Sequence, residues 1–286
     1  MKTYKIKPLL TGWFNINYGG LIFPFAEGYF ADLPVFMFLI ESEDGEQIIV
    51  DGSYTSWPFT IKAKPRTPEQ EVPAVLRNNG VDPDSIKTVI VTHLHHDHAG
   101  HLRVFKNASF YVQEKELLEA YNPPGPVAPG YNQEDWIDLV PRFQLIDGDF
   151  DLRDGLTLIH APGHTAGLQA VSVNTSKGRA IMFSDSLYLY AGLAKRFPIQ
   201  FFDLVGKSTK SAKESVSLQD PEVAKAIDKI FNGRYGGYFG PNIINPGENM
   251  RSMHKLNLMA DIVVPGHDPL LVDMKVIPDD YHLEGK

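Results

Sequence analysis

The sequence of 286 residues contains no cysteine, so it can form neither disulfide bonds nor thiolate metal sites. Any metal ion must therefore be held by imidazole nitrogens and carboxylate oxygens. No apolar stretch approaches the ~20 residues that a membrane-spanning helix needs. Residues 1–10 include three lysines but no apolar run of the kind that signal peptides carry. We therefore expect a cytoplasmic protein with no membrane partner.

Positive charge is also scarce. There are 27 lysines and arginines against 35 aspartates and glutamates, which gives a formal net charge of −8. A nucleic-acid-binding surface needs a basic face for the phosphates, so nucleic acid is not the expected partner. Hydrophobic residues make up 43% of the chain, enough for a large core. We expect a small-molecule partner, and the sequence leaves a homodimer open.

Short apolar runs separated by turn residues and helical patterns predict an α+β sandwich, in which helices cover two central mixed sheets. The strands are expected at residues 35–40, 47–50, 88–92, 109–113, 156–160, 168–173, 180–184 and 261–264, and the helices at 67–79, 99–105, 114–121, 221–231 and 250–260. We expect one domain over residues 1–286. Two segments, 13–32 and 187–250, are predicted to cover the substrate, because both contain glycine- and aromatic-rich stretches typical of loops.

Four metal-capable side chains gather in one short segment, His93-Leu94-His95-His96-Asp97-His98. The segment follows a β-branched run that reads as a buried strand. His93 and His95 would share one face of the extended chain, and Asp97 and His98 would fall in the turn before the next helix. A cluster of this composition can hold two divalent ions rather than one.

Three later residues occur in a similar context. His164 lies in a Pro-Gly-His turn after a predicted strand, Asp185 directly follows another, and His267 lies in a Pro-Gly-His sequence after the last. Because each candidate follows a short apolar run, all three could meet the 93–98 segment at one edge of the sheets.

With these motifs the chain resembles the metallo-β-lactamase superfamily. The pattern is H-x-H-x-D-H, then P-G-H, then Asp after a strand, then G-H, and Ile48-Ile49-Val50-Asp51-Gly52 resembles an early strand and turn of that family. The resemblance covers about residues 35 to 268 and implies an αββα sandwich with a dinuclear site. It assigns His93, His95 and His164 to one metal, Asp97, His98 and His267 to the other, and Asp185 to both. Zinc is the expected metal, with manganese, cobalt and iron as alternatives.

Within the superfamily the chain is most similar to the N-acyl-homoserine-lactone lactonase branch. Leu33-Pro34-Val35-Phe36, the run from His93 to Gly100, and Tyr188 three residues after Asp185 carry this similarity. In that branch a tyrosine at this position contacts the substrate carbonyl. The chain departs from the branch in the long separation of Asp185 and His267, 82 residues, which is expected to reshape the pocket.

The resemblance and the ligand pattern together predict a lactonase, and with it a role in quorum quenching. A hydroxide bridging two metal ions would attack the ester carbonyl. Tyr188 and one ion would stabilise the oxyanion. Asp97 would carry the proton to the leaving alkoxide, and Asp51 would orient a ligand imidazole.

Other interpretations of the same residues remain open. A glyoxalase II-like thioesterase and a mononuclear iron persulfide dioxygenase would use closely related sites, and a noncatalytic metal-dependent binding protein is a third alternative. Tyr188 could be a packing residue, as Tyr190 could be. The remaining histidines are expected to bind no metal; they are His96, His101, His160, His254 and His282.

Overall fold

The computed structural model describes residues 2–57, 61–125, 127–211, 238–240 and 245–283, together with residues 221, 225 and 229. Within this part of the chain no helix is both long enough and apolar enough to cross a bilayer. The helix predicted at 221–231 and much of the 187–250 segment lie outside the described residues.

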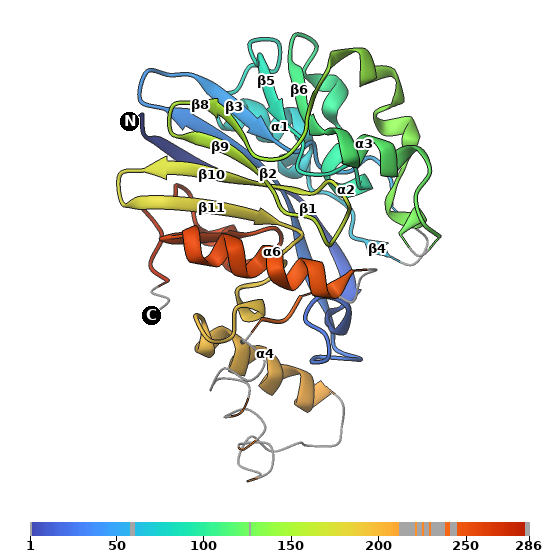
Figure 1. Ribbon diagram of the computed structural model, residues 1–286, viewed down its shortest axis with the longest axis vertical. Coiled ribbons are helices and arrows are strands. Elements are labelled where there is room, and N and C mark those ends of the chain that lie inside the picture. The colour runs from blue at the N-terminus through green and yellow to red at the C-terminus, as the bar shows by residue number, and fades with distance from the viewer. Residues whose placement is uncertain are drawn as a thin grey trace.

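Two mixed sheets face each other at the centre of the molecule (Figure 1). The larger has the order β4-β1-β2-β3-β5-β6-β7, with β1 (Tyr4–Asn17), β2 (Phe30–Ser42), β3 (Gln47–Val50), β4 (Lys62–Ala63), β5 (Thr88–Ile90), β6 (Ser109–Gln113) and β7 (Phe143–Ile146). The smaller has the order β12-β11-β10-β9-β8, with β8 (Phe150–Arg153), β9 (Leu156–His160), β10 (Gln169–Thr175), β11 (Gly178–Ser184) and β12 (Ile262–Pro265). Strands β3, β5, β6 and β7 are parallel neighbours, as are β11 and β12.

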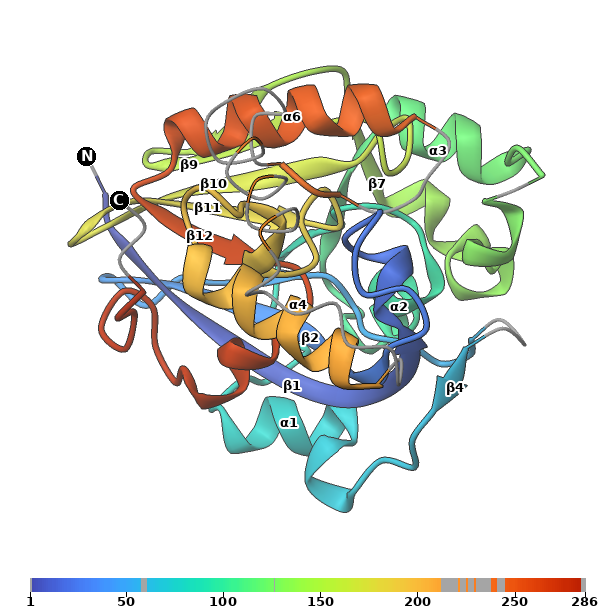
Figure 2. The ribbon, with the colours of Figure 1, turned by 90° about the horizontal axis from the view of Figure 1, so that it is seen from below.

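Helices form the outer layers. Figure 2 shows α6 (Pro246–Met259) over the smaller sheet and α1 (Val72–Asn78) beyond the larger one. The part of the chain that the structure describes also contains α2 (His96–Ala99), α3 (Glu114–Tyr121) and α4 (Pro198–Ser211). The predicted α+β sandwich with outer helices is therefore confirmed.

Strand β2 shows why the two sheets stack. Phe36, Phe38 and Ile40 contribute to the core between the sheets. Met37 and Leu39 belong to the cluster on the opposite face, which includes residues of α1 and α3. Side chains alternate along a strand, so a strand that is buried on both faces must be apolar throughout. The continuous apolar run at residues 35–40 reflects this double burial.

The predicted helix at 67–79 is divided in two. Thr67 and Gln70 form the expected capping box, but it caps a single 3₁₀ turn, Pro68–Gln70. The backbone of Glu71 is extended, and Pro73 then lies in the first turn of α1, where a missing N–H costs nothing. Gly80, with φ +70°, follows the helix end, as expected for a stop signal.

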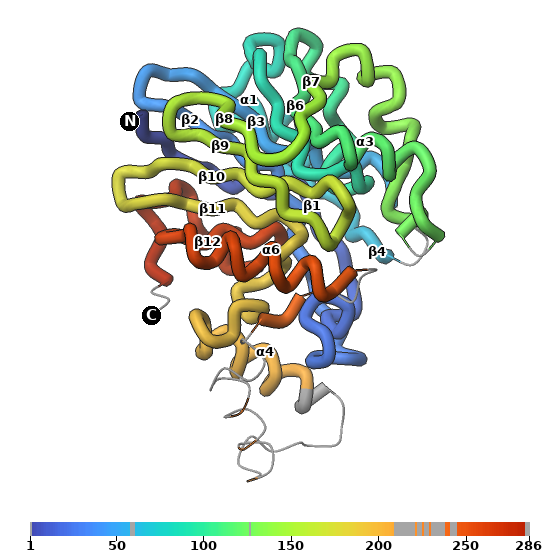
Figure 3. The backbone as a smooth tube through the Cα atoms, viewed as in Figure 1, coloured from blue at the N-terminus to red at the C-terminus, as the bar shows by residue number. Residues whose placement is uncertain are grey.

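Two further expectations were wrong in their boundaries, and one helix was not expected. The segment 13–32 is not one loop, because β1 continues to Asn17 and β2 begins at Phe30. The helix after the histidine cluster begins at His96 rather than residue 99, and Leu102–Val104 is a separate 3₁₀ turn. Helix α4, which the sequence did not predict, lies below the sandwich and beside the 18–29 loop (Figure 3).

Candidate metal centre

The seven predicted ligands come together at one edge of the sandwich. Strand β5 leads into the 93–98 segment, the β9–β10 turn carries His164, β11 runs into Asp185, and β12 runs into His267. Because β11 and β12 are parallel neighbours, the residues that follow them emerge side by side.

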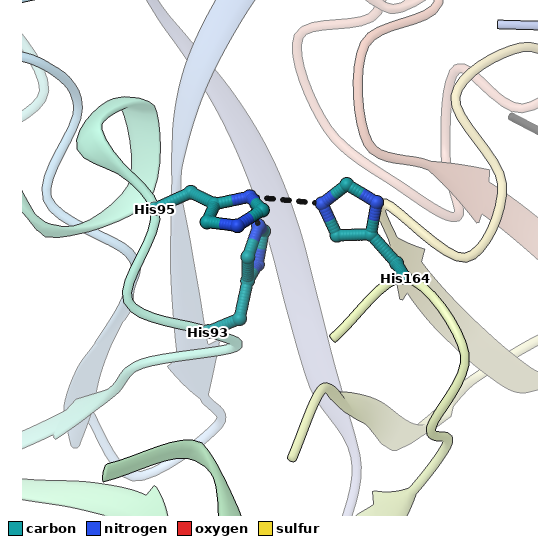
Figure 4. Close-up of side chains that lie close together, drawn as sticks. All are labelled: His93, His95 and His164. Atoms are coloured by element: carbon teal, nitrogen blue, oxygen red, sulfur yellow. Dashed lines mark hydrogen bonds between the residues drawn. The ribbon is translucent and has the colours of Figure 1, made fainter. Parts of the chain in front are cut away.

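Three imidazoles form the first group, and their candidate ligand atoms all lie within 4.8 Å of one another. Nδ1 of His95 is 3.1 Å from Nε2 of His93 and 3.0 Å from Nε2 of His164. The rings converge from two separate loops (Figure 4). Three nitrogens arranged in this way can bind one divalent ion.

The second group contains two carboxylates and two imidazoles, Asp97, His98, Asp185 and His267, again within 4.8 Å. Oδ1 of Asp185 is 3.3 Å from Nε2 of His98 and 3.0 Å from Nε2 of His267. Oδ2 of Asp97 is 3.7 Å from Nε2 of His267.

Asp185 lies between the two groups. While Oδ1 faces the second group, Oδ2 is 3.7 Å from Nε2 of His93 and 3.5 Å from Nε2 of His164. One carboxylate thus presents one oxygen to each group, which is the geometry of a bridging ligand.

The unsatisfied atoms of the site fit a pair of cations. Nε2 of His98, Nε2 of His267 and Oδ1 of Asp185 are buried and have no hydrogen-bond partner. Buried polar atoms are almost always paired, so three orphans that converge on one point need a common partner. A divalent cation bound by imidazole and carboxylate is such a partner.

Neighbouring groups orient the imidazoles of His98 and His267 toward the site. Nδ1 of His98 is 2.8 Å from Oδ2 of Asp51, and Nδ1 of His267 is 2.8 Å from the carbonyl of Pro34. Asp51 is itself fixed, because its carboxylate accepts hydrogen bonds from the amide and hydroxyl of Thr92. These contacts leave Nε2 of each ring directed at the site.

The electrostatics differ between the groups. Burial lowers the pKa of His93, His95 and His164, so these rings are neutral and ready to bind a cation. Burial also disfavours the charged forms of His98 and His267, but Asp185 and Asp97, joined by Asp51 at His98, together raise the pKa of both rings. A cation in the second group must therefore displace protons from these two rings.

The two candidate tyrosines have different surroundings. The ring of Tyr188 stacks on His267 at 5.5 Å and meets His164 edge-on at 5.8 Å. Burial, Asp185 and Asp97 raise the pKa of Tyr188, so its hydroxyl keeps its proton and can donate a hydrogen bond. The hydroxyl of Tyr190 instead donates to the carbonyl of Val263 in the core.

In the part of the chain that the structure describes, the five histidines expected to bind no metal are outside both groups. His96 is buried with its ring against Phe14 and its Nε2 3.9 Å from Oδ1 of Asp97, and Nε2 of His160 is 3.0 Å from the carbonyl of Ala166.

The sequence did not identify Glu116, whose buried carboxylate lies behind the first group. Burial raises the pKa of this carboxyl to about 7. One signal was available, since an acidic residue lies beside Leu117 and Ala120 on the apolar face of the predicted 114–121 helix.

A cavity of about 270 Å³ lies close to the site, between the 18–31 segment and α4. Its lining includes Tyr18, Leu189, Leu204 and Asp268. Leu189 and Asp268 directly follow Tyr188 and His267 in the sequence, while Tyr188 and His267 are not among the residues that line the cavity.

The family model that describes the metallo-beta-lactamase superfamily matches residues 31–267. An N-acyl homoserine lactonase from a Bacillus species is 29% identical over 215 residues, covering 68% of this chain and 82% of the relative.

Solved structures share the fold. One is an N-acyl homoserine lactone hydrolase with the product N-hexanoyl-L-homoserine at its catalytic metal centre; it has a TM-score of 0.68 at 22% identity and covers 94% of this chain and 95% of its own. Another is AidC, a dizinc quorum-quenching lactonase with a TM-score of 0.61 at 16% identity, covering 96% and 92%.

Proposed function

The chain belongs to the metallo-β-lactamase superfamily, and from this premise we propose that it is a dinuclear metal-dependent hydrolase that opens a lactone ring. The observation that supports this most directly is the position of Asp185, which offers one oxygen to each of two ligand groups. A mononuclear dioxygenase has no use for a complete second group, so the dinuclear hydrolase accounts for more of the buried residues.

The metal ligands in this proposal are His93, His95 and His164 on one side, Asp97, His98 and His267 on the other, and Asp185 between them. Two divalent ions held there would supply Lewis acidity and lower the pKa of bound water. Zinc is the proposed metal, because imidazole and carboxylate ligands suit it and AidC is described as dizinc.

The chain's own residues supply the remaining steps of hydrolysis. The Tyr188 hydroxyl, which keeps its proton, donates a hydrogen bond to the carbonyl oxygen as negative charge develops there. The oxygen of the attacking water forms a bond to the carbonyl carbon, and the ring C–O bond breaks. Asp97 accepts the proton of the water and delivers it to the alkoxide that leaves, so the product is a hydroxy acid.

N-acyl homoserine lactones are the proposed substrate class, because the curated relatives are named for that activity. Hydrolysis of such signals would make the enzyme quorum-quenching, as AidC is described. The 18–31 segment and α4, which enclose the cavity next to Tyr188, are proposed to cover the acyl group of the substrate.

Elemental analysis of the purified protein, paired with rates on a panel of lactones and thioesters, tests the proposal. We expect two metal ions per chain, loss of lactone hydrolysis in the apoprotein, and its recovery with Zn, Mn or Co. The variant Asp97→Asn should retain its fold but lose most of the rate of lactone hydrolysis.

Faster turnover of thioesters than of lactones would instead indicate a thioesterase, and oxygen consumption with one iron per chain would indicate a dioxygenase. Failure to hydrolyse any carbonyl substrate when loaded with two metals would favour a binding protein.

A further inference from the structure

A single buried carboxylate connects the two loops that carry the first group of imidazoles. Glu116 lies in the first turn of α3 and is fully buried. Its Oε1 accepts a hydrogen bond from the amide of Leu94 at 2.8 Å, and Leu94 lies between His93 and His95. The carboxylate therefore holds the backbone at the point from which both imidazoles project.

The other oxygen of the same carboxylate reaches the second loop. Oε2 of Glu116 accepts a hydrogen bond from the hydroxyl of Thr165 at 2.5 Å, and Thr165 directly follows His164. The loop approaches α3 closely, because a Cβ on Gly167 would lie 2.1 Å from the amide nitrogen of Glu116. Helix α3 thus sets the distance between the 93–95 and 164–167 loops.

A third loop is held by the same helix. The hydroxyl of Tyr131 donates to Oε1 of Glu119 at 2.8 Å and is 3.2 Å from Oε1 of Glu116. The Tyr131 ring packs edge-on against His95, with ring centroids 4.6 Å apart. These contacts close the outer side of the first group.

Given the proposed dinuclear centre, on which this inference rests, we propose that Glu116 is a positioning residue for one metal only, the ion held by His93, His95 and His164. The second group is oriented from elsewhere, by Asp51 and the carbonyl of Pro34. Loss of Glu116 should therefore weaken metal binding by the first group and leave metal binding by the second group unchanged. An apolar residue here would avoid the cost of burying a carboxyl group, but it would leave the amide of Leu94 and the hydroxyl of Thr165 without a partner.

Metal stoichiometry of Glu116→Ala and Glu116→Gln tests this inference. In the alanine variant the amide of Leu94 and the hydroxyl of Thr165 lose their partner, and we expect a 10- to 100-fold weaker first site. At a free zinc concentration that just saturates both sites of the unaltered protein, this variant should hold one ion per chain rather than two. Glutamine can accept from Leu94 through its oxygen and donate to Thr165 through its nitrogen, so it should restore most of the second ion.

Glu114→Ala is the matched control, since Glu114 lies in the same first turn of α3 but its side chain is exposed. It should keep two ions. If Glu116→Ala does not fold, Thr165→Val removes one of the two bonds and should weaken the same single site to a smaller degree. Two ions bound as tightly as in the unaltered protein, or equal weakening of both sites, would overturn the inference.

These measurements need no substrate. If the unaltered protein binds two ions but hydrolyses no lactone, the proposed function fails while the role of Glu116 can still be decided. If it binds fewer than two ions, the dinuclear centre itself is wrong.

Discussion

Tyr188 and Tyr190 are separated by one residue but make different contacts. Tyr188 stacks on His267, whereas the Tyr190 hydroxyl satisfies a carbonyl of β12. Tyr190 is fully buried in the core, whereas Tyr188 is half-buried beside two candidate ligand histidines, so residue type alone would not distinguish them. The contacts of each hydroxyl and ring do.

Replacing Tyr188 by phenylalanine should lower kcat by roughly 10²- to 10³-fold, because it removes one donor to the developing oxyanion. Metal content should stay at two ions per chain, since the hydroxyl is not a proposed ligand. Steady-state kinetics with elemental analysis measures both.

Tyr190→Phe is the paired control. It should leave kcat almost unchanged while destabilising the fold by about 1–3 kcal/mol, because the carbonyl of Val263 loses its buried partner. Equal losses of kcat in both variants would contradict a catalytic role for Tyr188.

At the scale of elements, the turn between β9 and β10 positions His164 through backbone geometry. Gly163 has φ +136°, and a Cβ there would lie 2.3 Å from the amide nitrogen of Asn249 in α6. The turn therefore rests directly on the helix that covers the smaller sheet. A side chain at this position must move either the turn or the helix.

Gly163→Ala should both destabilise the protein and weaken the first metal site, because the displaced turn carries His164. The comparison is Gly80→Ala, at φ +70° with open space around its Cβ position. That variant should cost only about 1 kcal/mol of backbone strain and leave metal binding intact. Thermal unfolding and zinc titration of the two variants measure the difference; identical zinc titrations would show that the turn tolerates the displacement.

At the scale of the molecule, the two segments predicted to cover the substrate pack on each other. Phe25, in the 18–29 loop, meets Phe201 of α4 edge-on at 5.2 Å and Phe239 at 5.1 Å. The cavity of about 270 Å³ lies between the loop and α4. Residues far apart in the sequence thus form one wall beside the candidate centre.

Leu204→Trp should fill part of this cavity. We expect kcat/KM for long-chain acyl lactones to fall about tenfold or more, with a smaller effect on an unsubstituted lactone. Ile199→Trp, at a position of α4 that is 77% exposed, serves as the control and should change neither rate. An equal fall for short and long substrates would place the acyl group elsewhere.

Acid should lower the free energy of unfolding, because His101 is partly buried in its neutral form. Burial, followed by the charge of Arg66, lowers the pKa of His101 to about 4 from an ordinary 6.5. Between these values the unfolded chain binds a proton that the folded chain does not, so stability is complete above pH 6.5 and falls as the pH drops toward 4. The loss is at most about 3 kcal/mol.

Urea unfolding at pH 7 and pH 5 measures this effect. His101→Gln should show a smaller drop in unfolding free energy between the two pH values than the unaltered protein. An equal drop in both would mean that other groups control the acid sensitivity.

The sequence by itself determined the local features. Short apolar runs predicted β3, β6 and β9, and the motifs placed each candidate ligand at the end of such a run. These features depend on side-chain periodicity over a few residues, which neighbouring residues alone specify. The metal-ligand roles of the seven residues stay a prediction until ions are measured.

Only the tertiary structure decided how those pieces meet. It brought Asp185 between two ligand groups, broke the 67–79 helix at Glu71, continued β1 to Asn17, and placed Glu116 against two loops. Each of these depends on contacts between residues distant in sequence, whose formation requires loop closure and shared burial that no local pattern records. The candidate ligands could therefore be predicted from the sequence, but the centre that they form depends on the packing of the two sheets.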